Sequence, residues 1–517
     1  MALPEIKPVN DQWQPGDPYT PVRTPCRFKN PLSKYRVWRN EAKCIQCGKC
    51  VEVCPYGVHA KAGKYVRKPK SYLCLGPACE KNAFYCVANC PAQALTVRLN
   101  PVYPTLGDYR WSGDLLLSTW WQAEFGTLPY SDLEYRTGAS GGGFDKLRFL
   151  FPPRHKDLKL THDDISLELE LNRRGDGRPQ IKLSVPWYSA GMSFGSISIN
   201  AMLSRLRSAV RFNTMMSTGE GGFPDELIPY QDFVITQVAT GLFGVREDTI
   251  QRVRMVEFKY AQGAKPGLGG HLLGDKVTPA VARMRESVPG SALFSPFPFH
   301  SVYSVEDHKK HLDWIKEINP RALVSVKVST PTDVDMVAVG SYYAGAHVVQ
   351  LDGSYGGTGA APDIAKKNIA MPIEFAIPKV HQFLKQEGIR EHVTLIASGG
   401  IRTAFDIAKA IALGADGVQV GTGEMVALEC LRCYQCESGR GCVRGIATTD
   451  PELVEMMTVE WGEKRVSNLY HSWAWQLKEI LRRLGMRSIR ELVGRTDTLV
   501  HLDYYNLPVD DDLRRGA

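Results

Sequence analysis

The 517-residue sequence predicts an α/β protein in which a (β/α)8 barrel, or TIM barrel, follows a small cysteine-rich domain. Three observations predict this fold. Short apolar runs alternate with helical stretches from about residue 165 to residue 425. Two glycine-rich loops follow successive runs near the end of that region. Twelve of the 13 cysteines fall in two tight groups, one before the barrel and one late within it.

The N-terminal part divides into an irregular extension and a cysteine-rich domain. Residues 1–40 are rich in proline and predict the extension. Within residues 41–100, four cysteines follow the Cys-x2-Cys-x2-Cys-x3-Cys-Pro spacing of bacterial ferredoxins, and four more end in the same Cys-x3-Cys-Pro pattern. We therefore predict a bacterial-ferredoxin-like domain with two [4Fe–4S] clusters. Structural zinc is the alternative, disfavoured by the paired endings. The expected ligands are Cys44, Cys47, Cys50 and Cys90 for one cluster and Cys54, Cys74, Cys79 and Cys86 for the other.

The barrel is expected over residues 166–445, after a connector with short elements over 101–165. Its clearest strands are apolar runs, which is typical of parallel strands buried on both faces; they cover residues 322–329, 346–352, 393–397 and 417–420. One predicted helix, between the last two, has Ala404, Ile407, Ala408 and Ile411 on one face. A doubly wound sheet is the alternative, disfavoured because no Gly-x-Gly-x-x-Gly follows an early strand. Residues 446–517 predict a C-terminal helical extension with an amphipathic helix over 473–484.

Two loops near the end of the barrel have the composition of a phosphate site. Ser398-Gly399-Gly400 and Gly421-Thr422-Gly423 follow successive strands, one helix apart. In a barrel they would follow strands seven and eight, where backbone N–H groups and a short helix N-terminus bind phosphate. Each loop alone could be a tight turn without a ligand. Two such loops after successive strands favour phosphate binding.

Several motifs resemble the FMN-binding synthase domain of glutamate synthase over about residues 165–500. They include GMSFGSIS (191–198), STGEGG (217–222), AQGAKPGLGG (261–270), GGTGAAP (356–362) and LGMRSIRELVGRTDTL (484–499). The N-terminal two-cluster domain resembles that of the archaeal-type members of the family. The resemblance implies a (β/α)8 barrel that binds FMN, in agreement with the alternation of strands and helices.

The resemblance also implies which residues contact the flavin. Met192, Ser193 and Gly195 would line its ring, and Lys327 would lie near its N1–O2 edge. A cation there stabilises the negative charge of the reduced flavin. A solvent-facing lysine is the alternative for Lys327, disfavoured by its apolar strand. At Gly356, Gly357 and Gly359 the backbone would approach the cofactor closely. The residues that would hold its phosphate are Gly399, Gly400, Gly421 and Thr422.

On the substrate side, the resemblance implies that Lys265 and Arg285 hold the carboxylates of a 2-oxoacid. Arg283 would be a surface charge, because Arg283 and Arg285 are two residues apart on one helix and only one of them can face the site. Glu220 would handle protons or gate ammonia, or else cap its loop. Four residues depart from the family pattern, through drift between subfamilies or because the product is a different amino acid: Leu268, His271, Phe299 and Ser301.

The second cysteine group predicts a third iron–sulfur cluster, in the loop over residues 430–442. Its family counterpart has three ligands and a [3Fe–4S] cluster, and Cys430, Cys436 and Cys442 match them. Cys433 is additional, and four thiolates would complete a [4Fe–4S] cube. The family pattern and the ligand count therefore disagree, and the count favours four irons.

Together these features predict an FMN iron–sulfur oxidoreductase of the EC 1.4 class. It would aminate 2-oxoglutarate reductively, through 2-iminoglutarate, to L-glutamate. Two alternatives remain open. A related synthase would make an N-alkyl glutamate or another amino acid, and an electron-transfer subunit of a larger flavoprotein complex would have no organic substrate.

Composition and the first residues predict the cellular setting. The net charge of +8 is mild for this length, and no nucleic-acid-binding module accompanies it. No run of 18 uncharged apolar residues and no signal peptide occurs, which predicts a cytoplasmic protein without a membrane span. Ala2 stands where the family has a nucleophilic cysteine. We therefore expect ammonia to come from a separate glutaminase-like subunit or from solution. We also expect a hetero-oligomer, with that subunit, with a ferredoxin or flavoprotein reductase as electron donor, or with both.

Overall fold

The computed structural model describes residues 15–28, 32–82, 85–129, 143–153 and 160–504, apart from Ala360, Asp363 and Lys367. Ala2, part of the predicted connector and the last 13 residues lie outside the described residues. Among the described residues, no helix is long and apolar enough to cross a membrane.

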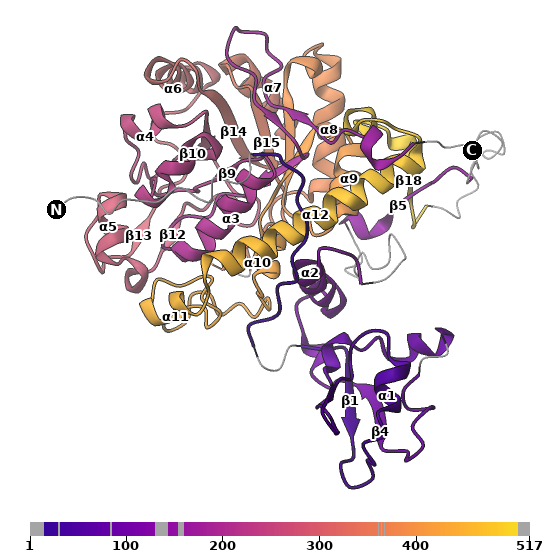
Figure 1. Ribbon diagram of the computed structural model, residues 1–517. Coiled ribbons are helices and arrows are strands. Elements are labelled where there is room, and N and C mark those ends of the chain that lie inside the picture. The colour runs from indigo at the N-terminus through magenta and orange to yellow at the C-terminus, as the bar shows by residue number, and fades with distance from the viewer. Residues whose placement is uncertain are drawn as a thin grey trace.

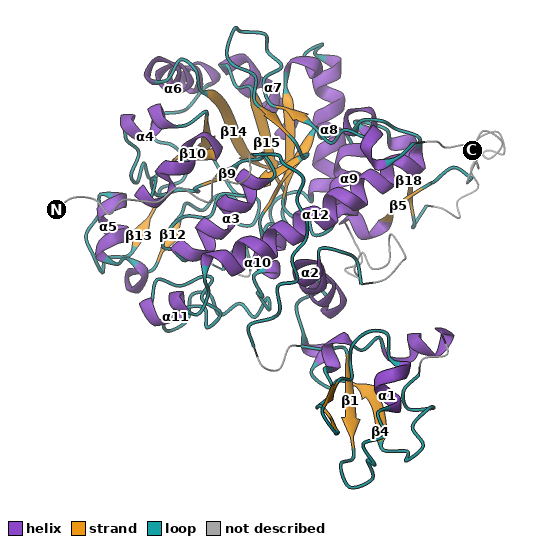
Figure 2. Ribbon diagram, viewed as in Figure 1, coloured by secondary structure: helices purple, strands orange, loops and turns teal. Residues whose placement is uncertain are grey.

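The predicted (β/α)8 barrel is confirmed (Figures 1 and 2). Eight parallel strands follow one another around a closed barrel in chain order, and pairing of Val418 with Trp187 closes it. Their side chains are buried on both faces, which explains the apolar runs in the sequence. The strands are β8 (Trp187–Ser189), β9 (Met216–Ser217), β10 (Val234–Ala239), β11 (Met255–Lys259), β14 (Leu323–Ser329), β15 (Val348–Asp352), β16 (Thr394–Ser398) and β17 (Gly417–Val420).

Helices cover the outside of the barrel and connect its strands. Between β9 and β10 a 3-10 segment, η6 (Asp225–Phe233), takes the place of an α-helix. The predicted helix after β16 is α9 (Ala404–Ala412), which Thr403 caps by accepting a bond from the Asp406 N–H. The other connecting helices are α3 (Ile199–Arg211), α4 (Glu247–Arg252), α6 (Val305–Ile318), α7 (Val334–Ala344), α8 (Ile373–Gln386) and, after the last strand, α10 (Thr422–Ala427).

An excursion between β11 and α6 adds a small layer to the barrel. It contains the antiparallel pair β12 (His271–Leu272) and β13 (Leu293–Phe294) and the helix α5 (Pro279–Arg285). Leu272, Val281 and Leu293 share a separate small core. The excursion therefore has packing of its own and can hold polar side chains against the barrel.

The C-terminal helix is longer than predicted. α12 (Val459–Leu484) begins at Val459, not at residue 473, and Thr458 caps it. The sequence of its first half does not show a clear apolar face, because two polar residues there, Arg465 and Asn468, are buried. Arg465 Nε donates to the Ala427 carbonyl at 2.8 Å, and the Asn468 amide donates to the Val22 carbonyl at 2.8 Å.

The cysteine-rich domain begins earlier than predicted. β1 (Tyr35–Arg39) lies within the segment expected to be irregular, and it pairs with β4 (Leu95–Leu99). The proline-rich composition of residues 1–40 concealed a strand of only five residues whose partner is distant in sequence. We call residues 32–100 the N-terminal module; it also contains α1 (Lys49–Val53), β2 (Lys61–Ala62) and β3 (Tyr65–Val66).

The predicted connector contains a helix that bridges the two parts of the molecule. Trp121 and Phe125 of α2 (Gly113–Phe125) pack on the core of the N-terminal module. Trp120 packs with Val426 and Cys430 of the barrel. Figure 1 shows α2 between the barrel and the N-terminal module. The remaining elements are β5 (Leu147–Phe149) paired with β18 (Leu499–His501), β6 (Leu169–Glu170) paired with β7 (Lys182–Leu183), and α11 (Pro451–Glu455).

Candidate functional site

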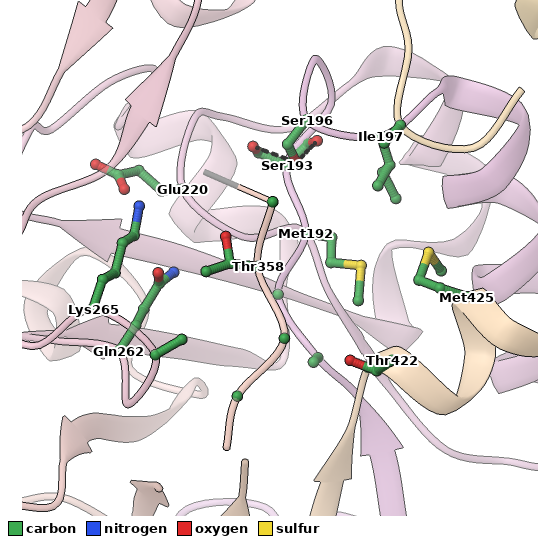
Figure 3. A pocket seen from close by; sticks show the side chains of 18 of the residues that line it. Met192, Ser193, Ser196, Ile197, Glu220, Gln262, Lys265, Thr358, Thr422 and Met425 are labelled. Atoms are coloured by element: carbon green, nitrogen blue, oxygen red, sulfur yellow. Dashed lines mark hydrogen bonds between the residues drawn. The ribbon is translucent and has the colours of Figure 1, made fainter. Parts of the chain in front are cut away.

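A cavity lies at the carboxyl ends of the barrel strands (Figure 3). Figure 3 shows Glu220 and Lys265 on one side of it and Met192, Met425 and Thr422 on the other. Nearly all predicted cofactor and substrate residues line it: Met192, Ser193, Glu220, Lys265, Arg285, Lys327, Gly356, Gly357, Gly359, Gly399, Gly400, Gly421 and Thr422. Most of them come from loops that follow barrel strands, while Lys327 lies on β14 and Arg285 on α5. A barrel gathers such loops at one end.

Gly195 is not among the residues that line the cavity. Its φ is +101°, a conformation that favours glycine. A Cβ at this position would lie 3.1 Å from Leu272 and 3.2 Å from Val281, in the excursion. The structure thus gives no support to the prediction that Gly195 lines a flavin ring, and it shows this glycine in a turn that packs against Leu272 and Val281.

Two positions in the glycine loops, Gly357 and Gly399, leave no room for a side chain. A Cβ on Gly357 would lie 2.2 Å from Thr422 Oγ1, and one on Gly399, whose φ is +87°, would lie 2.4 Å from the Gly353 carbonyl oxygen. Gly399 and Gly421 follow the seventh and eighth barrel strands, as predicted. Their backbone therefore faces the cavity directly, at the end of the barrel that binds phosphate in many enzymes.

Lys327 points into the barrel and not to solvent. It is 5% exposed, and its Nζ lies 3.6 Å from Asp352 Oδ2. Glu257 is fully buried in the barrel interior. Burial raises the pKa of Glu257, although Lys327, Gln237 and Lys259 oppose the shift. The solvent-facing alternative for Lys327 is therefore excluded, and this lysine supplies positive charge to the floor of the cavity.

Lys259 is a second inward-facing lysine, which the sequence analysis missed. It pairs in register with Lys327 on the neighbouring strand, and its Nζ lies 3.2 Å from Glu220 Oε2. The Ser295 hydroxyl donates to the other oxygen of Glu220. Burial opposes ionisation of Glu220, but Lys259, Ser295 and Arg285 together bring its pKa below the usual value. Glu220 is therefore ionised at neutral pH, as an acceptor and not a proton donor.

Lys265 lies beside this group and is 5% exposed. In Figure 3 its amine points toward Glu220. Burial and the nearby charge of Lys259 lower the pKa of Lys265 to about 8, although Glu220 and Glu437 oppose the shift. The charge on Lys265 therefore changes within the physiological range of pH.

Arg285 is buried, whereas Arg283 on the same helix is exposed. Nη2 of Arg285 donates to Ser193 Oγ at 2.8 Å and to the Phe194 carbonyl at 3.0 Å. Its Nε is buried without a hydrogen-bond partner. A Cβ on Gly221 would lie 2.6 Å from Arg285 Cζ, so only glycine permits this position. The geometry thus leaves a donor of Arg285 unsatisfied beside the cavity.

Of the four residues that depart from the family pattern, only His271 lines the cavity. Its ring stacks on Phe294 at 4.7 Å. Phe299 packs on Phe258 at 4.6 Å, and the Ser301 hydroxyl bonds to His311 at 2.9 Å. Leu268 is 45% exposed. Of these four departures, only that at His271 therefore lies in the lining of the cavity.

Three cysteines of the second group line the same cavity, and the fourth does not. Cys430, Cys436 and Cys442 are in its lining, whereas Cys433 is exposed. The Arg432 N–H donates to Cys430 Sγ at 3.4 Å, as backbone donors do to cluster ligands. Burial raises the pKa of the Cys430 thiol to about 12, with a smaller contribution from Cys436 and Cys442.

Cys86 and Cys50 of the N-terminal module each lie near other cysteines of the first group. Burial raises the pKa of the Cys86 thiol to about 12, and the nearby thiols of Cys74, Cys54, Cys79 and Cys50 add to the shift. The first three of these neighbours belong with Cys86 in one predicted ligand set. Burial likewise raises the pKa of Cys50, with Cys44 and Cys47 as its thiol neighbours. Backbone N–H groups donate to Cys74 and Cys90 at 3.3 Å each.

Arg110 is a further residue at the site that sequence reasoning missed. It comes from the predicted connector, lies 3.7 Å from the Tyr355 ring centre, and would meet a Cβ on Gly400 at 3.2 Å. Burial and the neighbouring Arg402 lower its pKa, but Asp406 and Asp145 oppose the shift. Arg110 thus brings a cation next to a predicted phosphate loop from about 290 residues away. No local sequence signal points to it.

Comparisons with known proteins agree with this geometry. Residues 150–487 match the family described as "Conserved region in glutamate synthase", and residues 39–59 match "4Fe-4S binding domain". The archaeal-type glutamate synthase [NADPH] of Thermotoga maritima is 38% identical over 503 residues, which cover 92% of this chain and 96% of that protein. The archaeal glutamate synthase [NADPH] of Methanocaldococcus jannaschii is 36% identical over 495 residues, 90% of this chain and 94% of that protein. The glutamate synthase [NADPH] large chain of Azospirillum brasilense is 38% identical over 315 residues, which cover 60% of this chain and 21% of that protein.

Proposed function

Because the chain belongs to the glutamate synthase family, we propose that it reduces the imine of 2-oxoglutarate and ammonia to L-glutamate. Enzymes of this family are oxidoreductases of the EC 1.4 class, and this chain is one of them. The observation that carries the proposal is the group of cations at one side of the cavity. Lys259, Lys265 and Arg285 lie around the ionised carboxylate of Glu220 there, whereas Glu437 at the same cavity is paired with Lys276.

This excess of positive charge suits a substrate with two carboxylates. A buried cation is costly unless an anion pairs with it, and a bound dicarboxylate would supply the missing anions. The unsatisfied donor of Arg285 fits the same role, because a guanidinium pairs with a planar carboxylate through two hydrogen bonds. Lys265 would hold the second carboxylate, so that the imine carbon is fixed in one position.

The opposite side of the cavity fits FMN. Bound FMN supplies the hydride that reduces the imine carbon. Lys327 would stabilise the negative charge at the N1–O2 edge of the reduced flavin, and Met192 and Ser193 would line its ring. The phosphate would be held by the backbone of Gly399, Gly400, Gly421 and Thr422. The lack of room for a Cβ at Gly399, 2.4 Å from the Gly353 carbonyl oxygen, supports this assignment.

Electrons would reach the flavin through iron–sulfur clusters. The N-terminal module would hold two [4Fe–4S] clusters on its eight cysteines, in the two ligand sets predicted from the sequence. A third cluster would lie at Cys430, Cys436 and Cys442, in the wall of the flavin cavity. We further propose a hetero-oligomer. A glutaminase-like subunit would supply ammonia unless ammonia comes from solution, and a ferredoxin or flavoprotein reductase would supply electrons.

A single-turnover experiment tests the proposed function. The protein is reduced anaerobically with dithionite and mixed with 2-oxoglutarate and ammonia. We expect reoxidation of the flavin and formation of L-glutamate. Methylamine in place of ammonia tests for an N-alkyl glutamate synthase, which would give N-methylglutamate faster than glutamate. If no 2-oxoacid reoxidises the flavin, the chain is an electron-transfer subunit and the proposal fails.

Substrate affinity should fall as the pH rises above about 8. The pKa of Lys265 is lowered to about 8, so its amine is charged below that pH and neutral above it. Only the charged amine attracts a carboxylate, and KM for 2-oxoglutarate should therefore rise through this range. The Lys265→Arg variant keeps its charge to higher pH and should lose this rise. Initial rates across pH give both profiles, and a KM that stays flat in the wild type would contradict the assignment.

The third cluster should be a [3Fe–4S] cluster held by three thiolates. The reason is that Cys430, Cys436 and Cys442 line the cavity together, whereas Cys433 does not. Total iron should be about eleven per chain, against about twelve for three four-iron clusters. EPR of the oxidised protein should show the three-iron signal in Cys433→Ser and lose it in Cys436→Ser. Loss of a cluster in Cys433→Ser would instead support four ligands.

A further inference from the structure

The N-terminal module carries the whole net positive charge of the chain. Residues 32–100 contain 12 Lys and Arg against three Glu and no Asp, an excess of nine. The full chain has 63 Lys and Arg against 55 Asp and Glu, so the other residues have 51 against 52. Two clusters with four thiolates each would remove about two charges apiece and leave the module clearly basic. A positive electrostatic potential concentrated on one module is typical of a docking surface for an acidic partner.

One end of this module faces the barrel. Tyr72, two residues before Cys74, lies beside Arg23 and Glu124, which belong to the barrel side of the molecule. Trp121 and Phe125 of α2 pack on the module core close by. The predicted cluster of Cys54, Cys74, Cys79 and Cys86 therefore lies toward the barrel.

The other end of the module is open to solvent. β1 runs from Tyr35, which packs against Gly76 near Cys74, to Arg39, which bonds to the Val66 carbonyl at 2.7 Å. Arg39 is also a charged neighbour of Cys50, in the other predicted ligand set. Figure 1 shows the module projecting from the rest of the molecule beneath α2. The predicted cluster that includes Cys50 thus lies away from the barrel, with Cys47 exposed.

A patch of apolar and basic side chains surrounds that open end. Ile45 and Tyr65 are 66% and 72% exposed, although side chains of this kind are usually buried. Lys61 lies over Gly48, next to Cys47, because a Cβ on Gly48 would be 2.7 Å from its Cε. Lys43 is exposed two residues before Ile45, and Lys64 is exposed next to Tyr65. Among the described residues, Lys43, Lys61 and Lys64 have no ion-pair partner. We call Lys43, Ile45, Lys61, Lys64 and Tyr65 the distal patch.

We propose that the distal patch is the docking surface for a small acidic electron-carrier protein, which reduces the cluster beside Cys47. Apolar residues within a rim of charges are the composition of such encounter surfaces. Weak redox encounters bury less than about 1,200 Å², so such a partner needs only a small docking surface. The exposed Cys47 distinguishes the surface from a nucleic-acid or membrane site, because it brings a redox centre to the contact.

The electron balance of this inference rests on the proposed function. Two carrier molecules are each oxidised by one electron. The two electrons pass through the clusters and, with two protons from solvent, convert the imine of 2-oxoglutarate into the amine of glutamate. The carrier is the reductant, and no other oxidant or reductant is needed.

A pair of matched variants tests the docking surface. In Lys61→Glu/Lys64→Glu the charge of the distal patch is reversed at two positions. In Arg36→Glu/Arg98→Glu the same change is made on two exposed residues that face each other across β1 and β4, toward the barrel end of the module. Iron content and the EPR spectrum of each reduced full-length variant establish that its clusters are intact. The probe is a reduced, acidic two-cluster bacterial ferredoxin, mixed with each protein in a stopped-flow instrument at low ionic strength.

We expect the second-order rate of cluster reduction to fall at least about tenfold in the distal-patch variant and by less than about threefold in the control. The wild-type rate should fall as salt is added, and the rate of the distal-patch variant should change little. Equal rates in the wild type and the distal-patch variant, or an equal loss in both variants, would overturn the proposal.

Reduction by dithionite separates this inference from the proposed function. Both variants, once reduced chemically, should form L-glutamate as the wild type does. If no protein forms glutamate but the ferredoxin rate still depends on the distal patch, the proposed function fails and the docking surface stands. If all three proteins form glutamate but only a pyridine-nucleotide flavoprotein and not the ferredoxin reduces the clusters, the docking proposal fails and the function stands.

Discussion

Replacing Arg285 by alanine should lower kcat/KM for 2-oxoglutarate by about thirty- to several-thousand-fold. This range corresponds to about 2–5 kcal/mol, the cost of removing one partner from a buried charged pair. Arg285 is buried, it donates to Ser193 and the Phe194 carbonyl, and its Nε lacks a partner beside the cavity. A bound carboxylate would satisfy that donor, and alanine would leave the carboxylate without its principal cation.

The measurement is stopped-flow reoxidation of the reduced flavin by 2-oxoglutarate and ammonia. Arg283→Ala is the matched control, because Arg283 is exposed on the same helix and its removal should change the rate little. Arg285→Lys should recover only part of the activity, since an ammonium cannot form the two parallel bonds of a guanidinium. A wild-type rate in Arg285→Ala, or a damaging Arg283→Ala, would show that the substrate assignment is wrong.

Replacing Lys327 by alanine should lower the two-electron reduction potential of the bound flavin by about 45–90 mV. A cation next to the reduced flavin would stabilise its negative charge by about 2–4 kcal/mol in a buried site, and 30 mV corresponds to about 1.4 kcal/mol. Lys327 is 5% exposed in a barrel interior that also holds Glu257 and Asp352. Its removal takes away a cation that acts on both acids, so the flavin should be harder to reduce.

The potential is measured by anaerobic dye titration, with iron content as a check that the clusters remain. Lys259→Ala is the comparison, because Lys259 is adjacent in register but pairs with Glu220 on the substrate side. It should raise KM for 2-oxoglutarate and shift the potential by less than half as much. Lys327→Arg should keep most of the wild-type potential. If the potential is unchanged in Lys327→Ala, this lysine does not contact the flavin edge.

Features that depend on local spacing could be predicted from the sequence. The apolar runs specified β14 through β17 to within two residues, because strands buried on both faces have no polar alternation. The cysteine spacings grouped Cys86 with Cys54, Cys74 and Cys79, and these three thiols are among its neighbours. The loops at Gly399 and Gly421 do follow the seventh and eighth strands. In each case residues close in sequence are also close in space.

The tertiary structure alone decided which distant residues meet. Arg110 approaches Gly400 from about 290 residues away, and Lys259 meets Glu220 only because the barrel brings the ends of neighbouring strands together. The structure also removed Gly195 from the cavity, left Cys433 exposed and placed Phe299 against Phe258. Side-chain direction and burial depend on packing between segments far apart in the chain. Local patterns in the sequence do not show those contacts, because they form only when the barrel folds.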